Sequence, residues 1–210
     1  MSMKQTISCR ALIFGMTIMT LLMAGCGTSP PAKFYTLTPV IAPQPTEKVV
    51  ETEKANLVAI GPVEIPEYLD RPEIVTRAEQ NQLILSEYNL WGGGLKADIN
   101  RVLIENISSS LAADGIPIIT WRGTISEAHR VPVVINRFDG SLNESIVLKA
   151  RWALLEKEGK TFEYVRDTII TIPVKGSSYG SVVAAMSEAL GELGKEIAAG
   201  IRSGVKKQNK

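Results

Sequence analysis

The stretch "YGSVVAAMSEALGELGKEIAAGI", Tyr179 to Ile201, decides the fold of this 210-residue chain. Its apolar residues recur at helical spacing and hold one stripe for about six turns. Four glycines, at positions 180, 191, 194 and 200, each cost up to ~1 kcal/mol inside a helix. The stripe must be buried against a sheet or a neighbouring element to offset that cost. Ser177 or Ser178 is well placed to cap the start of the helix.

The residues before this helix predict antiparallel strands. Between Ser145 and Glu156, apolar residues alternate with Lys149 and Arg151, which is typical of a sheet with one face in water. A tight turn at 158–160 leads into a second strand, Thr161 to Ile172, and Val131 to Phe138 predicts a third.

The first half of the chain predicts further strands and a second helix. In "LVAIGPVEI", Pro62 suggests an edge strand or a bulge, and Asp114-Gly115 ends the second helix. We expect one α/β domain (α+β is the alternative) over residues 34–210, with a mixed, largely antiparallel sheet flanked by two long amphipathic helices. The elements expected in this half are strands at 34–38, 57–65 and 116–121, a hairpin over 72–91 with a longer loop at 78–81, and a helix over 95–111.

The chain begins with the layout of a secretory signal. Lys4 and Arg10 precede an uncharged run at 11–24, whose length of roughly 21 Å falls short of the ~30 Å hydrocarbon core of a membrane. The run ends in Met23-Ala24-Gly25-Cys26, which resembles the lipobox of bacterial lipoproteins. This resemblance implies a signal peptide at 1–25, removed before an acylated Cys26. We expect a tether at 26–33 and an exposed connector at 39–54.

The cysteine count argues against other roles for Cys26. The only other cysteine, Cys9, lies inside the signal, so the mature chain has no partner for an intramolecular disulfide and no second thiolate for a metal. Removing Lys4 and Arg10 reduces 23 basic residues to 21, against 22 acidic ones. The mature domain is therefore close to neutral, which excludes an electrostatic preference for nucleic acid.

The inventory of reactive side chains predicts no enzyme, catalytic residue, metal or cofactor. His129 is the only histidine, which excludes a multi-histidine metal site. We expect no Ser-His-Asp triad either, because the polar surroundings of His129 predict a solvated side chain. Gly92-Gly93-Gly94 lacks the Gly-Lys-Ser/Thr ending of a phosphate-binding loop. We therefore expect a flexible connection between strand and helix there.

The segment "IPEYLDRPEIVTR", residues 65–77, admits two interpretations. Asp70 and Glu73 form an acid and base pair in one. In the other, which we favour, the carboxylates pair with Arg71 and Arg77 and pin a turn. A tyrosine and a leucine displayed on that turn, Tyr68 and Leu69, form a contact patch for a partner, an interpretation that ranks above catalysis.

The apolar stripe of the last helix also admits two interpretations. Val182, Met186, Leu190 and Leu193 either line a lipid groove, since methionine adapts to irregular space, or pack in the core. The core interpretation is the better one because every core-facing helix shows such a stripe.

Several motifs together resemble the auxiliary lipoproteins of ABC-type transport systems, in particular the outer-membrane lipoproteins of paraquat-inducible intermembrane transport systems. They are the lipobox at Cys26, "FYTL" at 34–37, "IGPVEIPEYLDRPEIVTR" at 60–77, Trp91 with Leu95, and "RFDGSLNESIVLKARWALLE" at 137–156. The resemblance covers nearly the whole mature chain. It departs between Trp91 and Leu95, where relatives usually carry a proline and this chain carries glycines.

The resemblance implies a periplasm-facing, non-enzymatic domain beside an MCE-type protein that bridges two membranes and carries lipid or another hydrophobic compound. Gly27 is not the aspartate that retains lipoproteins in the inner membrane, which favours the outer membrane. A lipid-binding carrier for phospholipid is the alternative, and small residues on the last helix allow a homo-oligomer. The expected partner-contact residues are Tyr68, Leu69, Arg71, Pro72, Trp91 and Leu95.

Overall fold

The computed structural model describes residues 29–40, 56–123, 128–157 and 161–208. Residues 32–210 form a compact unit separate from residues 1–31, and the following description concerns the former. The signal peptide, Cys26, most of the connector and the turn at 158–160 lie outside the described residues. Within the described ranges, no helix is both long and apolar enough to cross a membrane.

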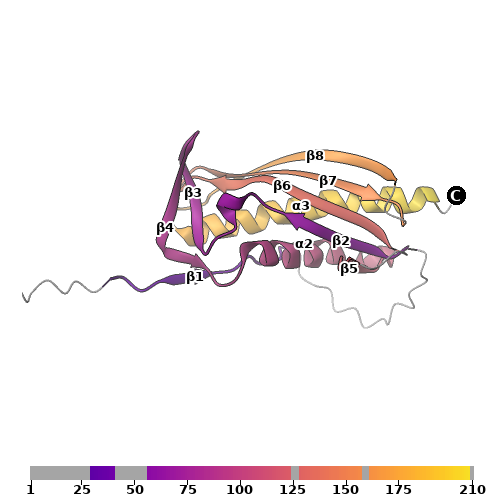
Figure 1. Cartoon of the computed structure of the whole chain (residues 1–210), viewed down its shortest axis with the longest axis horizontal. Helices are drawn as coiled ribbons and strands as arrows, with labels where there is room; N and C mark the ends of the chain where they lie inside the picture. Colours follow the sequence, from indigo (N-terminus) through magenta and orange to yellow (C-terminus); the bar gives the residue numbers. More distant parts are fainter. Residues whose placement is uncertain (1–28, 41–55, 124–127, 158–160, 209–210) are drawn as a thin grey trace, which may run out of the picture. The chain divides into compact units, whose positions relative to one another are not determined.

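A five-stranded sheet forms the larger layer, in the order β5-β2-β6-β7-β8 (Figure 1). β6, β7 and β8 are antiparallel, as predicted, whereas β2 is parallel to both of its neighbours. β2 is thus an inner strand, and the register shift between Ile60 and Val63 shows that the bulge was the right alternative for Pro62, which has no N–H to donate. The strands are β2 (Val58–Glu64), β5 (Ile118–Thr120), β6 (His129–Gly140), β7 (Ser145–Leu155) and β8 (Phe162–Pro173).

A second, three-stranded sheet has the order β1-β4-β3. β3 (Glu73–Glu79) and β4 (Gln82–Trp91) form the predicted hairpin, but its connection is only Gln80-Asn81, shorter than the expected loop. β1 (Lys33–Tyr35) pairs in parallel with the end of β4. The domain therefore contains two mixed sheets where the sequence predicted one. A short helix, η3 (Glu67–Leu69), precedes the hairpin.

Two long helices pack against each other, and α3 also lies along β7 and β8 (Figure 1). α2 (Leu95–Leu111) continues into a turn, η4 (Ala112–Asp114), that ends at the left-handed Gly115, as predicted. α3 (Tyr179–Gln208) begins after Ser178, whose Oγ accepts the Ser181 N–H at 3.1 Å. This bond confirms the predicted cap.

The apolar stripe of α3 lies in the core. Val182, Met186, Leu190 and Leu193 are at most 1% exposed, so they do not line a groove and the core interpretation is confirmed. Gly200 lets α3 approach the sheet closely, because a Cβ at this position would overlap the Tyr164 hydroxyl. The predicted α/β domain with two long helices is confirmed, and the buried stripe explains how glycines are tolerated in α3.

Candidate functional site beside the N-terminal segment

An open cleft of about 560 Å³ lies where β1 meets the start of α2. One wall is the N-terminal segment and the other is the glycine loop with the first turns of α2. Its lining residues are Phe34, Tyr35, Thr36, Gly92, Gly93, Gly94, Ala97, Asp98 and Arg101.

Backbone hydrogen bonds bring three distant segments together at this cleft. The Trp91 N–H donates to the Pro72 carbonyl at 2.8 Å, and the Gly92 N–H donates to the Tyr35 carbonyl at 2.7 Å. The Tyr35 hydroxyl donates to Asn89 Oδ1 at 3.0 Å. The two loops expected from the sequence to be exposed, around Pro72 and after Trp91, therefore lie side by side.

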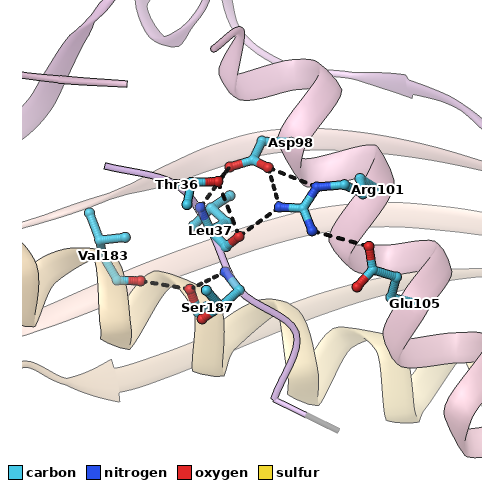
Figure 2. Close-up of polar contacts among 8 residues, drawn as sticks. Thr36, Leu37, Asp98, Arg101, Glu105, Val183 and Ser187 are labelled. Atoms are coloured by element: carbon cyan, nitrogen blue, oxygen red, sulfur yellow. Dashed lines mark hydrogen bonds and ion pairs between the residues drawn. The ribbon is translucent and has the colours of Figure 1, made fainter. Parts of the chain in front are cut away.

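The first turns of α2 hold the N-terminal segment through charged side chains, as Figure 2 shows. Asp98 Oδ2 accepts the Leu37 N–H at 2.6 Å and the Thr36 hydroxyl at 2.9 Å. Arg101 donates to the Leu37 carbonyl at 2.7 Å and pairs with Asp98 and Glu105. The hydrogen bond that Arg101 donates to Asp98 raises the pKa of Arg101, which therefore stays charged.

Polar side chains on both helices complete the attachment. The Thr38 N–H donates to Ser187 Oγ of α3 at 3.2 Å, and the Ser187 hydroxyl donates to the Val183 carbonyl at 2.9 Å (Figure 2). The Val40 N–H donates to Asn106 Oδ1 of α2 at 3.1 Å. Buried or half-buried backbone N–H groups must find acceptors. Here side-chain oxygens accept the hydrogen bonds that a neighbouring strand would otherwise accept. We call residues 36–40 the clamped segment.

The sequence analysis did not identify the side chains that hold the clamped segment. Ser187, only 3% exposed, was the available signal, because it is a polar residue within the apolar stripe of α3. Asp98 and Arg101 carried no such signal, because charges three residues apart are ordinary on a helix surface.

Three of the six expected contact residues are core residues. We expected Leu69, Trp91 and Leu95 at the surface, but they are 2%, 5% and 1% exposed. Burial of these apolar side chains in the core lowers the free energy of the folded chain more than exposure on a contact surface would. Arg71 is half-buried and Pro72 exposed, and for these two the contact role stays a prediction.

Tyr68, the sixth, belongs to a buried ionic cluster around Asp139. Asp139 is fully buried and accepts hydrogen bonds from Arg77 Nε at 2.7 Å, Arg137 Nε at 2.9 Å and the Tyr68 hydroxyl at 2.6 Å. Burial raises the pKa of the Asp139 carboxyl, but the bonds from Arg77 and Tyr68 outweigh burial and hold it below its ordinary value. Burial and the same contact raise the pKa of Tyr68 to about 12.

The cluster corrects the expected local ion pairs. Arg77 does not pin a turn through Asp70 or Glu73 but pairs with Asp139, 62 residues further along the chain. Asp70 is exposed, and its pairing with Glu73 as acid and base has no support in the described geometry. Among the described residues, no group of three or more His, Cys, Asp or Glu side chains is placed to hold a metal.

His129 is buried, which contradicts the expected solvated side chain. It lies at the first position of β6, is 1% exposed, and its Nδ1 is 3.3 Å from Glu163 Oε1. Burial lowers the pKa of His129, and the charge of Glu163 only partly offsets this. The prediction failed because the strand begins earlier than Val131, where we placed its start.

This burial predicts a pH-dependent stability. The unfolded chain binds a proton at His129 below about pH 6.5, whereas the folded chain resists it, so the free energy of unfolding falls as the pH falls through this range. We expect the apparent Tm to drop more steeply between about pH 7.5 and about pH 5.5 in the wild type than in His129→Gln. Parallel slopes in a thermal scan series would contradict this. No other histidine titrates in this range.

The family model for the ABC-type transport auxiliary lipoprotein component matches residues 35–198, from β1 into α3. The chain belongs to this family. As a family member it is a lipoprotein component of a transport system, and the expected resemblance is confirmed at that level. A search of the curated proteins finds no significant match.

Solved structures share the fold at low sequence identity. A crystal structure of an uncharacterized protein is 18% identical, with a TM-score of 0.67, over 82% of this chain and 99% of that one. Protein XCC0632 from Xanthomonas campestris, of family DUF330, is 16% identical, with a TM-score of 0.65, over 85% of this chain and 100% of that one. Since both identities are low, these likenesses show the fold alone.

Proposed function

We propose that this family member is an outer-membrane lipoprotein, acylated at Cys26, that docks an MCE-type membrane-bridging protein of an intermembrane transport system. The cargo would be lipid or another hydrophobic compound. The family match supports the transport role and the lipoprotein class. The lipobox and Gly27 support the acylation site and the outer membrane.

The observation that carries the proposal is the clamped segment. It begins ten residues after Cys26, and it is bonded to both helices through Asp98, Arg101 and Ser187 (Figure 2). A domain held by an acyl anchor needs such a connection, because a frayed N-terminus would let the domain drift from the membrane. The clamp therefore fixes the point at which the chain leaves the domain toward the anchor.

The docking surface in this proposal is the cleft and the loops beside it. Pro72 and the glycine loop are exposed, and Phe34 on the rim is 67% exposed. An exposed aromatic ring beside a concave surface suits a partner that inserts a side chain into the cleft. Because the mature domain is near neutral, shape and apolar contact would matter more than electrostatic steering.

The lipid-carrier alternative loses its main support. It relied on the apolar stripe of α3, whose four side chains lie in the core. The non-enzymatic assignment remains part of the proposal. His129 pairs with Glu163, and Asp139 is held by two arginines and a tyrosine, so both side chains have structural explanations.

The proposal predicts a specific cross-link in cells. A photo-crosslinking amino acid at Gly93, on the cleft, is expected to capture an MCE-type protein that mass spectrometry identifies. The same amino acid at Lys149, exposed on the outer face of β7, serves as the matched control and should capture much less.

Acylation is tested in the same strain. Intact-mass analysis should show diacylglycerol on Cys26, and Cys26→Ser should leave the membrane fraction and lose the cross-link. Equal capture from Gly93 and Lys149, or capture of unrelated proteins only, would refute docking at the cleft.

A further inference from the structure

The β3–β4 hairpin carries an apolar surface that the core does not use. Ile84, Leu85 and Tyr88 on β4 are 45%, 43% and 36% exposed. In Figure 1 the hairpin projects from one end of the unit, beyond the five-stranded sheet. Single exposed apolar residues are ordinary on a protein surface, but three within five positions of one projecting strand form a patch.

The patch occupies both faces of the hairpin. Ile84 pairs with Thr76 and Leu85 with Val75, and neighbouring side chains on a strand point to opposite faces. A protein that packed on one face of the hairpin would cover either Ile84 or Leu85 and leave the other in water. A lipid surface that receives the edge of β4, which β1 pairs only from Asn89 to Trp91, covers both and leaves the polar turn at 80–81 outside the apolar layer.

The chain before β1 places the hairpin near the anchor. Lys33 pairs with Asn89, and Cys26 lies seven residues before Lys33. Those seven residues reach at most about 25 Å. Ile84 lies five residues along β4 from Asn89, at most roughly 17 Å away. A membrane that holds the acyl chains of Cys26 is therefore within reach of the hairpin.

The charges of the hairpin favour a neutral lipid surface. The turn is Gln80-Asn81, and the exposed charges of the hairpin are the carboxylates of Glu79 and Glu87, with Arg77 turned inward to Asp139. Lys33 on β1, opposite Asn89, is the exposed positive charge beside them. Acidic side chains disfavour an anionic surface, whereas apolar contact needs no lipid charge. Tyr88 has an apolar ring and a polar hydroxyl, which suits the headgroup level of a membrane.

We propose that the hairpin inserts Ile84, Leu85 and Tyr88 into the surface of the bilayer that holds Cys26, as a second attachment point beside the acyl anchor. A single anchor point leaves the domain free to tilt, and a second contact removes that freedom. The cleft then faces the partner at a defined angle. The inference rests on the proposed acylation for the location of the membrane.

The cysteine content of the chain makes a direct test simple. Once Cys26 is acylated, a cysteine introduced at Ile84 is a unique site for an environment-sensitive fluorophore. Phe162, 59% exposed, is the matched control. Phe162 lies at the far end of the five-stranded sheet. Through Leu155 it is level with Arg130 at the start of β6. Arg130 is nine residues, roughly 30 Å, from Asp139, which contacts the hairpin through Arg77.

The test uses the acylated chain in vesicles of phosphatidylethanolamine and phosphatidylcholine. Label at I84C, and at L85C as a second position, is expected to shift to shorter emission wavelength and to be quenched by quencher-bearing lipid. Label at F162C should remain as in water. Unshifted emission at both hairpin positions, or equal quenching at the hairpin and at F162C, would overturn the inference.

A second arm separates this inference from the proposed function. Six histidines in place of Cys26 hold the chain on nickel-chelating lipid with a similar tether, so the hairpin is tested even where acylation fails. No transport partner is present, so a lost signal leaves docking at the cleft unaffected.

A third measurement uses the chain without any anchor. The double substitution I84S/L85S should lower its partition into vesicles on the order of tenfold. Unchanged partition would contradict membrane contact, and so would a photo-crosslinking amino acid at Ile84 that captures a protein and no lipid in cells.

Discussion

Asp139→Ala is expected to lower the free energy of unfolding by about 3 kcal/mol. The Asp139 carboxylate is fully buried and bonded to Arg77, Arg137 and Tyr68. Its removal leaves two arginines without their anion at the junction of the two sheets. Because the side chains of Arg77 and Arg137 remain 18% and 31% exposed, water partly compensates. The expected loss therefore lies at the lower end of the range for broken buried pairs.

The matched control for this substitution is Asp167→Ala. Asp167 also forms an ion pair with an arginine, Arg151, at 2.7 Å, but the two side chains are 64% and 61% exposed. An exposed pair contributes little to stability, because water screens the charges in the folded state. Urea unfolding of both variants measures the difference in their free energies of unfolding. It follows from the shift of the midpoints, provided that the slope m is unchanged. Similar losses for the two would show that the Asp139 cluster is not an important support of the fold.

Gly140→Ala is expected to be the most damaging small substitution, at about 3 kcal/mol or more. A Cβ at Gly140 would overlap the Ser145 carbonyl oxygen and lie 2.8 Å from the Ile146 Cα. Both contacts are main-chain atoms that cannot rotate away, and Ile146 is the cross-strand partner of Gly140. The β6–β7 hairpin must open locally to make room.

Gly93→Ala is the control for the glycine substitution, because a Cβ there meets no atom within 4 Å. We expect its free energy of unfolding to stay within about 0.5 kcal/mol of the wild type. Thermal or urea unfolding compares the two directly. If Gly140→Ala were as well tolerated as Gly93→Ala, the β6–β7 turn would be able to shift without loss, contrary to the packing observed.

Local patterns predicted the secondary structure well. The helices at 95–111 and 179–201, the hairpin over 72–91 and the antiparallel strands after 131 all depend on periodicity and turn residues within short windows. The contacts between windows were not predictable in the same way. Arg77 and Asp139 are 62 residues apart, and nothing near either residue indicates the other.

The candidate site shows the same division. The sequence indicated the loops around Pro72 and after Trp91 as exposed contact loops, but it did not indicate that they lie beside "FYTL", as the backbone bonds show. It misplaced Leu69, Trp91 and Leu95, because an apolar side chain on a loop is equally compatible with a contact surface and with a core.

By itself, the sequence determined the class of this protein: an α/β domain with two amphipathic helices and the features of a transport auxiliary lipoprotein. Only the tertiary structure decided that β2 is an inner strand, that His129 and Asp139 are buried, and that residues 36–40 are bonded to both helices. Periodicity reports which face of an element is apolar, but not which distant element covers that face. The burial of a residue and the pairing of its charge depend on which distant element packs against it.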